Sequence, residues 1–387
     1  MNKRKRNIYL MYLIIFFQGF VFYGPIATLY RQANGLSMSD IFIIESFFGL
    51  CIIIFEVPWG WLADRVGYKW IFVISNALLF ISKIIFYEAD SFNLFLLERV
   101  LLALALSGIS GCDIAILHNS TDKGESEKVF GRYSAFSTFG YIMATFMSGY
   151  FLKKSMEMAA FATIIPYGIA VVLTFFIIDD NCVVGEKTKI KDSLKLLLRD
   201  KKMILFLLSV TFIREIIQSV MVFLSQLQYT KSNIEIVYFG IIAGGLQIMG
   251  LISAKGYKIS EKIGHTKSIR LIYISLSLTC ILLALTSNPV FTIFLMAIVS
   301  LSRGLLEPMV MTIQNNSIKT NNRAVMLSLY SMVGSIVSSG INPLIGISAD
   351  RSLETSFLFC GLLGVIATIL HFFLKEKNPV NYKVILE

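Results

Sequence analysis

Long apolar runs alternate with short polar segments along the whole chain. Twelve of these runs are long enough to match the hydrocarbon core of a bilayer, which takes roughly 20 helical residues to cross. They are residues 8–30, 40–63, 70–87, 92–118, 131–152, 157–178, 203–227, 233–254, 268–287, 290–315, 323–347 and 353–374. In lipid, backbone N–H and C=O groups need partners inside their own segment, so each run is predicted to be a helix. The pattern predicts an all-α membrane protein with twelve transmembrane helices.

The polar stretch 179–202 divides the chain into halves. We expect an N-terminal six-helix bundle over 1–178, a cytoplasmic central loop over 179–202, and a C-terminal six-helix bundle with a short cytoplasmic tail over 203–387. Weak matches recur at an offset of 196 or 197 residues. They predict two parallel six-helix repeats about an axis along the membrane normal. The matches pair 64–67 with 261–264, 117–120 with 313–316, and 133–134 with 330–331.

The composition agrees with a membrane protein and adds an orientation. The chain is 56% hydrophobic and only 16% charged, whereas soluble domains are about one quarter charged. With a cytoplasmic N-terminus, 26 of the 35 Lys and Arg residues fall in predicted inside segments and 5, including Arg31, fall outside. This positive-inside bias places both termini in the cytoplasm of a bacterial plasma membrane. It also explains the net charge of +10 without a nucleic-acid partner.

Several classes of chemistry find no support in the sequence. The five cysteines are scattered without a CxxC spacing and the three histidines are isolated, so neither a metal site nor a disulfide framework is indicated. Walker-type GxxxxGK[ST], HExxH and GxSxG motifs are absent. We therefore expect a protein that is not an enzyme and needs no cofactor.

The segment GWLADRVGYKW lies between the second and third predicted helices, at residues 60–70. It resembles the G-x-L-a-D-R-x-G-r-k signature of the major facilitator superfamily and departs from it at Tyr68. The preceding 55–58, FEVP, is similar to a prokaryotic exporter-like branch, and Arg99 resembles the arginine of the family's fourth helix. The glycine-rich pattern of the fifth helix is only partly present, as Gly140 and Gly149. The resemblance implies the twelve-helix fold of that family and a transport function.

The same segment is predicted to gate the cytoplasmic side. Gly60 and Gly67 permit a tight turn, and the resemblance implies that Asp64 faces the positive N-terminal end of the eleventh helix, near Arg323. Such contacts would latch the two halves together. Asp113 can pair with one of two cations of this segment, Arg65 or Lys69. The alternative is a solvated turn that only obeys the positive-inside rule.

Charged residues within the predicted helices are the candidates for substrate binding and coupling. A lipid-facing charge at the midplane costs roughly 2.5–3.5 kcal/mol, so these side chains should face protein or water. In the family that the chain resembles, helices 1, 4, 7 and 10 line the central cavity. The candidates on these helices are Glu98, Arg99, Arg214, Glu215, Arg303 and Glu307, with Gln18 and Gln218 as polar lining. The alternative is that they form structural salt bridges between helices.

Glu307 is slightly favoured over Glu215 as the proton site. It follows Arg303 by four residues, so the two can pair along one helix face, and Pro308 offers a local bend that can change their distance. Lys83 is expected to snorkel toward the outer interface. Glu45 and Glu56 are expected to serve interfaces more than substrate.

Three functions remain open. The first is alternating-access export of a small amphiphilic compound by a monomer in membrane lipid, driven by the proton gradient. The second is an importer or uniporter of a small polar or peptide-like solute with the same fold. The third is a membrane sensor or membrane-embedded enzyme, which no motif supports.

Overall fold

The computed structural model describes residues 3–122, 124–178, 195, 197–253, 256, 263–318 and 323–374, without the side chains of Val57, Asp64, Arg323 and Ala324. Within these ranges the regular structure is helical. Ten helices of the described chain are long and apolar enough to cross a membrane. Two further segments pack beside them: α7 (Ser126–Leu152) and the interrupted pair α1 (Lys3–Gln18) and α2 (Ala27–Ala33). The all-α membrane architecture predicted from the apolar runs is confirmed.

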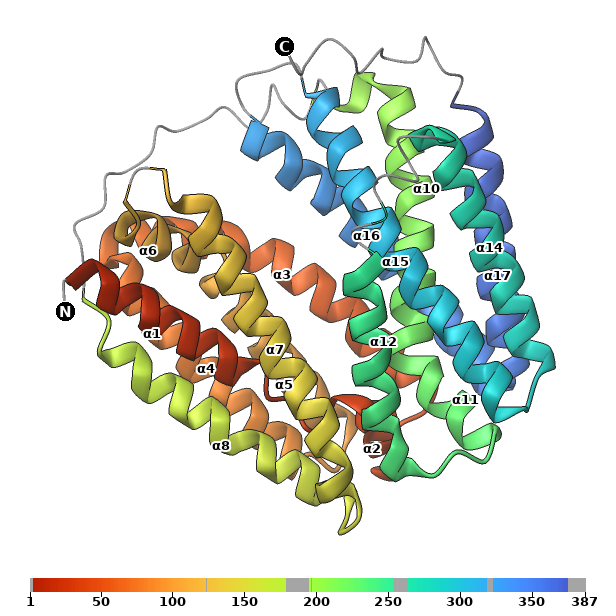
Figure 1. Ribbon diagram of the computed structural model, residues 1–387, viewed down its shortest axis with the longest axis horizontal. Helices are drawn as coiled ribbons and strands as arrows, with labels where there is room; N and C mark the ends of the chain where they lie inside the picture. Colours follow the sequence, from red (N-terminus) through yellow and green to blue (C-terminus); the bar gives the residue numbers. More distant parts are fainter. Residues whose placement is uncertain are drawn as a thin grey trace.

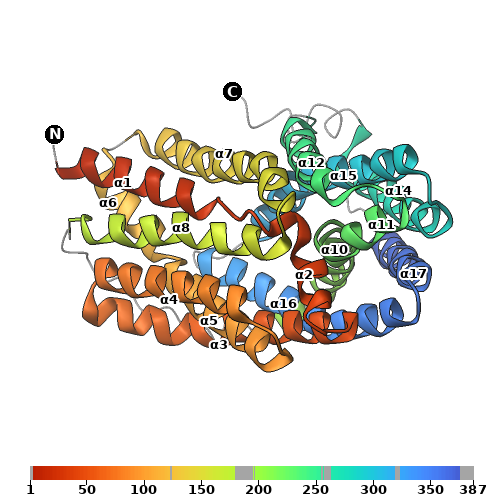
Figure 2. The ribbon, with the colours of Figure 1, turned by 90° about the horizontal axis from the view of Figure 1, so that it is seen from below.

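The helices of the N-terminal half continue with α3 (Met38–Val66), α4 (Tyr68–Glu88), α5 (Phe92–Ile109), α6 (Cys112–Ser120) and α8 (Met156–Phe175). Those of the C-terminal half are α10 (Lys201–Gln218), α11 (Ser225–Lys231), α12 (Phe239–Ser253), α14 (His265–Leu285), α15 (Pro289–Ser317), α16 (Arg323–Arg351) and α17 (Leu353–Phe372). The two sets form adjacent bundles (Figures 1 and 2). Most of residues 179–202, the predicted central loop, lies outside the described residues.

Three runs predicted as continuous helices are interrupted. The first breaks after Gln18 and resumes at Gly24 with a short 3-10 turn that leads into α2. The fourth breaks at Gly111, whose φ of +87° is accessible to glycine at little cost. The seventh passes through a π-helical turn over Ser219–Leu224. Breaks and π turns are common at functional sites, and the first and third of these flank polar clusters described below.

Gly67 and Gly264 show that the two halves repeat the same local construction. Gly67 joins α3 to α4 with φ +93° and ψ +145°, and Gly264 precedes α14 with φ +90° and ψ +141°. These are the two glycines that the sequence match at 64–67 and 261–264 pairs. A side chain with a Cβ is strained at such a positive φ, so both turns require glycine.

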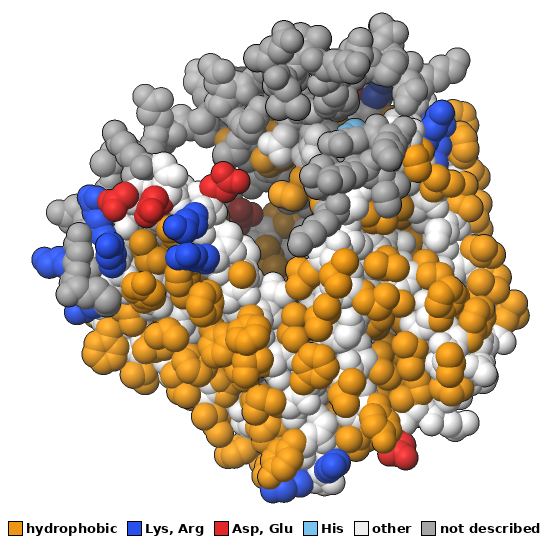
Figure 3. Space-filling model, in the orientation of Figure 1, with side chains coloured by type: hydrophobic (Ala, Val, Ile, Leu, Met, Phe, Trp, Pro, Cys, Tyr) orange, Lys and Arg blue, Asp and Glu red, His pale blue; other side chains and the backbone are white. Residues whose placement is uncertain are grey.

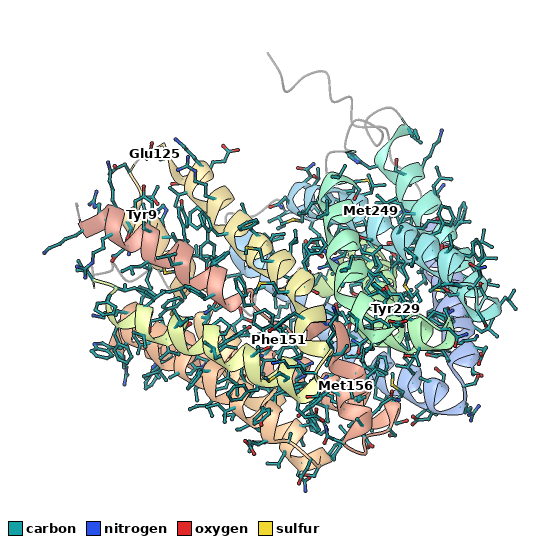
Figure 4. All side chains as sticks on the ribbon, turned by 60° about the horizontal axis from the view of Figure 1, so that its bottom comes forward. Tyr9, Glu125, Phe151, Met156, Tyr229 and Met249 are labelled. Atoms are coloured by element: carbon teal, nitrogen blue, oxygen red, sulfur yellow. The ribbon has the colours of Figure 1, made fainter. Side chains whose placement is uncertain are left out.

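The bundles meet along two helix pairs, α3 with α16 and α7 with α12. A Cβ on Gly240 of α12 would collide with the backbone of Thr145 of α7, so these two helices approach closely there. Phe151 and Met156 mark this end of the N-terminal bundle, while Tyr9 and Glu125 lie at its opposite end (Figure 4). Hydrophobic side chains cover the mid-height of the molecule and charged ones gather toward its two ends, as expected for a membrane-spanning belt (Figure 3).

Candidate substrate and coupling site

A cavity of about 330 Å³ lies between α3, α10 and α16, with Gln314 of α15 at its wall. Polar side chains outnumber apolar ones in its lining. The lining residues are Glu45, Phe48, Gly49, Ile52, Leu207, Val210, Thr211, Arg214, Glu215, Gln218, Gln314, Tyr330, Ser331, Gly334, Ser335, Ser338, Ser339 and Asn342. Three of the predicted site residues therefore meet in one place: Arg214, Glu215 and Gln218.

Glu215 is the buried acid of this cavity. Its residue is 6% exposed, and Ser219 Oγ donates to its Oε1 over 3.5 Å. The hydroxyl of Ser338 also hydrogen-bonds this carboxyl group. The contact links α10 to α16, the helix that packs against α3 at the bundle interface. Among the ion pairs of the described residues, none includes Glu215. The π turn that follows α10 begins at Ser219, so the helix widens directly beside this carboxyl group.

Glu307 pairs with Arg214 on the neighbouring helix, and the predicted pairing with Arg303 is wrong. Arg214 Nε donates to Glu307 Oε1 over 3.0 Å, and its Nη2 donates to Oε2 over 2.6 Å. Both side chains are about 40% exposed. Arg303 is exposed and lies within electrostatic reach of Tyr141 on α7. The bidentate pair joins α10 to α15 inside the C-terminal bundle.

Glu98 and Arg99 belong to a buried ladder of four charges in the N-terminal bundle. Arg99 Nη2 lies 3.5 Å from Glu45 Oε2, and its Nε lies 3.7 Å from Glu98 Oε2. Glu98 in turn lies 3.5 Å from Nη2 of Arg31, whose side chain is only 3% exposed. The guanidinium of Arg31 packs over the Phe86 and Phe95 rings at 5.3 and 5.7 Å.

Arg31 and Glu45 are the members of this ladder that the sequence interpretation missed. Arg31 was expected in an outside loop, but the break in the first helix turns α2 inward and buries it. Glu45 was expected at an interface, yet it reaches the cavity and pairs with Arg99. The available signal was the adjacent pair Glu98 and Arg99 within a predicted helix, because adjacent residues do not face each other on a helix and each charge then needs a partner on another helix.

A second polar cluster surrounds the break in the first helix. Gln18 Nε2 donates to Asn76 Oδ1, and Tyr167 Oη donates to the backbone oxygen of Gln18 over 2.7 Å. Lys83 is 4% exposed, and its Nζ donates to Tyr23 Oη over 3.1 Å. The expected snorkelling of Lys83 is therefore wrong, since the ammonium group points into the bundle. Gln18 holds the broken helix ends in place and is not among the residues that line the cavity.

The described charged side chains of the gating segment contact residues of the N-terminal bundle, and Ser328 Oγ of α16 lies 3.5 Å from Glu56 Oε1 beside the segment. Arg65 packs over Trp61 at 3.8 Å and Lys69 over Trp70 at 5.5 Å. Asp113 accepts a hydrogen bond from Tyr133 Oη at 3.2 Å instead of pairing with either cation. Gly60 lies inside α3 with open space where a Cβ would stand, so the expectation that it forms part of the turn is wrong and Gly67 alone makes the turn. The side chain of Asp64 lies outside the described residues.

At the other end of the bundle interface, two helix N-termini of the N-terminal bundle are bound by side chains of the C-terminal bundle. Asp350 of α16 accepts from the backbone N–H groups of Met38 at 2.7 Å and Ser39 at 3.1 Å, where α3 begins. Gln226 Oε1 of α11 accepts from Thr28 N at 2.8 Å, in the first turn of α2. Orphan N–H groups at helix starts favour such acceptors. The interface is thus closed at this end.

The class of protein to which this chain belongs is identified by the match of its sequence to a family model. The model described as Major Facilitator Superfamily matches residues 8–343. The chain belongs to the major facilitator superfamily. It is therefore a multi-pass membrane transporter and not an enzyme, as the sequence predicted.

Several known members of the superfamily are similar to this chain. The quinolone resistance protein NorA of Staphylococcus aureus is 29% identical over 166 residues, so the chain matches only 40% of the length of NorA. The multidrug resistance protein 2 of Bacillus subtilis (strain 168) is 23% identical over 392 residues, 97% of this chain and 96% of that protein.

Solved structures of the superfamily share the fold. A mutant of the nucleoside transporter NupG superposes with a TM-score of 0.83 at 14% identity, covering 97% of this chain and 100% of that one. A bacterial homologue of the human lysosomal transporter Spinster, described as inward-facing and unoccupied, superposes with a TM-score of 0.77 at 14% identity, covering 97% of each chain. At this identity the likeness concerns the fold alone.

Proposed function

We propose that this superfamily member exports a small compound across the bacterial plasma membrane in exchange for protons, acting as a monomer with no cofactor. The observation that carries the proposal is Glu215, a buried carboxyl group in a cavity between the bundles that forms no ion pair with a cation of the described residues. Burial disfavours a lone carboxylate, so such a group takes up a proton readily and releases it when its surroundings become polar. The resistance proteins among the relatives support the outward direction.

Alternating access follows from two opposed contacts of the same helix pair. In the observed state Asp350, near the end of α16, binds the start of α3 and closes one side. In the opposite state we propose that Asp64, near the end of α3, faces the start of α16 and closes the other side. In each state one of the two carboxylates would bind a helix N-terminus and the other would not, so the two states stay close in free energy.

A second candidate is an importer or uniporter of a small polar solute, which the polar lining of the cavity favours. Transport direction separates the two. A pump-deficient bacterial host that expresses the chain should gain resistance to particular toxic compounds and lose it when a protonophore collapses the proton gradient. Uptake of a solute that persists without a gradient would replace the export proposal by the second candidate.

The topology is the first specific prediction, because it underlies the direction of transport. A reporter that works only in the cytoplasm should be active when fused after Glu387 or inserted within 185–195. It should be inactive when inserted at Lys153, which the positive-inside bias places outside. Activity at Lys153 would reverse the orientation and with it the assignment of the gating segment to the cytoplasmic side.

The gating segment provides a second prediction. Asp64→Asn should lower transport strongly at near-normal expression, because it removes the charge proposed to bind the start of α16. A carboxylate at a helix N-terminus contributes roughly 0.3–2 kcal/mol, so the state closed on the cytoplasmic side should lose up to about 30-fold in population. Labelling of cysteines placed in the cytoplasmic half should rise accordingly.

The matched control for this variant is Asp122→Asn. Asp122 is 70% exposed and pairs at 3.5 Å with a half-exposed Arg4 on the same side of the molecule. Exposed pairs of this kind contribute about 0–1 kcal/mol, so transport should stay unchanged. Equal transport by the Asp64 and Asp122 variants would leave the segment as an ordinary solvated turn.

A further inference from the structure

The charge balance of the cavity identifies what kind of ligand it suits. Two acids and one arginine line it: Glu45, Glu215 and Arg214. The charge of Glu45 is balanced by Arg99, whose Nη2 lies 3.5 Å from Glu45 Oε2. The charge of Arg214 is balanced by its bidentate contact with Glu307. Arg303 is not part of the lining and lies toward Tyr141. The cavity therefore carries one negative charge in excess whenever Glu215 is ionised.

One buried side-chain acceptor of the lining has no donor within the described structure. Asn342 is 4% exposed, and its Oδ1 has no hydrogen-bond partner within the described structure. The next residue, Pro343, lies inside α16 and has no N–H, so the carbonyl of Ser339 lacks its usual helical donor. Buried acceptors without donors are costly, and a bound ligand that donates hydrogen bonds removes this cost.

The size and the scarcity of aromatic rings favour a small ligand over a bulky lipophilic cation. A volume of about 330 Å³ is at the low end of the roughly 300–1,000 Å³ of ligand pockets. Phe48 and Tyr330 are the aromatic residues of the lining, and the Phe48 ring already carries the guanidinium of Arg99 at 5.4 Å. A flat apolar cation would find little free aromatic surface.

We infer that the cavity binds a small polar organic cation, a protonated amine with additional hydroxyl or amino donors, with Glu215 as its counter-ion and Asn342 as an acceptor. The inference rests on the proposed function in one respect, namely that this cavity is the transport site. Ligand and proton then compete for the same carboxylate, so binding of the cation requires Glu215 to be ionised. This substrate class is more polar than the amphiphilic compound expected from the sequence.

Binding to the purified full-length protein in detergent tests the inference without any proton gradient. The probes are glucosamine and ethanolamine, their neutral counterparts glucose and ethylene glycol, and tetraphenylphosphonium as a lipophilic cation. At a pH where the amines are protonated, at least one amine should raise the unfolding temperature saturably while its neutral counterpart does not. Its affinity should weaken by about tenfold or more in Glu215→Gln, because a charged hydrogen bond is lost. Asn342→Ala should weaken it less.

Glu354→Gln is the control variant. Glu354 lies at the start of α17, pairs with Lys231 of α11 and does not line the cavity. This variant should bind the amine like the unaltered protein. The inference is overturned if neither amine stabilises more than its neutral counterpart, if tetraphenylphosphonium alone binds, or if sodium alone stabilises in a Glu215-dependent way. A protein that binds the amine but moves no protons would instead contradict the proposed function and keep the inference.

Discussion

Replacing Glu215 by Gln is expected to abolish proton-driven export while leaving the protein folded. Glutamine has the shape of a protonated carboxyl group and can keep the contact with Ser219, but it cannot take up or release a proton. Removing an ionisable group from a site that is 6% exposed also removes its desolvation cost. Substrate-dependent proton movement in proteoliposomes should therefore fall to the level of empty liposomes, whereas the unfolding temperature should stay the same or rise.

Glu307→Gln is the decisive comparison, because the sequence favoured Glu307. Its carboxylate is held by two hydrogen bonds from Arg214 and serves as the partner of that arginine, whereas Glu215 has no such cation among the described ion pairs. We expect this variant to lose stability through the unpaired Arg214 and still to couple export to protons. If Glu307→Gln uncouples transport and Glu215→Gln does not, the structural preference for Glu215 is wrong and the sequence-based choice is right.

The fold could be predicted from the sequence because lipid leaves apolar runs few alternatives. A run such as 70–87 has no stable state in a bilayer other than a helix, and α4 occupies it with small shifts at both ends. The turn at Gly67 was predictable for a similar reason, since few residues besides glycine tolerate its backbone angles. These are local constraints, and each is visible within a few residues.

The pairing of charges could not be predicted, because it depends on how each helix is rotated about its axis. Spacing alone made Arg303 the natural partner of Glu307, but rotation of α15 turns Glu307 toward α10 and leaves Arg303 toward α7. The burial of Arg31 depends on the break after Gln18, which apolarity does not reveal. Gly19 marks that break, since a Cβ there would collide with the backbone of α7 at Ser137 and Tyr141.

Glu98→Gln is expected to be the most destabilising single change in the buried ladder. It removes the acid that lies 3.5 Å from Arg31 and leaves that guanidinium buried between aromatic rings without a counter-charge. Removing one partner of a buried ion pair costs about 3–5 kcal/mol. The purified variant should show a much lower unfolding temperature, or little monodisperse protein on size-exclusion chromatography.

Lys231→Ala is the matched control, because it breaks a shorter but exposed ion pair. Lys231 Nζ lies 2.6 Å from Glu354 Oε1, with side chains 25% and 45% exposed. Water compensates for the loss of such a contact, so the expected cost is about 1 kcal/mol or less. Equal losses from Glu98→Gln and Lys231→Ala would show that the ladder charges are solvated and not buried.

The double variant Glu98→Gln with Arg31→Met should recover much of the lost stability. Methionine keeps contact with the Phe86 and Phe95 rings without bringing a charge, and Arg99 retains Glu45 as its partner at 3.5 Å. The ladder then returns from a net positive charge to neutrality. If the two substitutions instead add their separate costs, the Arg31–Glu98 contact is not energetically coupled. The instability of Glu98→Gln would then come from the lost contact between Glu98 and Arg99, and not from a stranded Arg31.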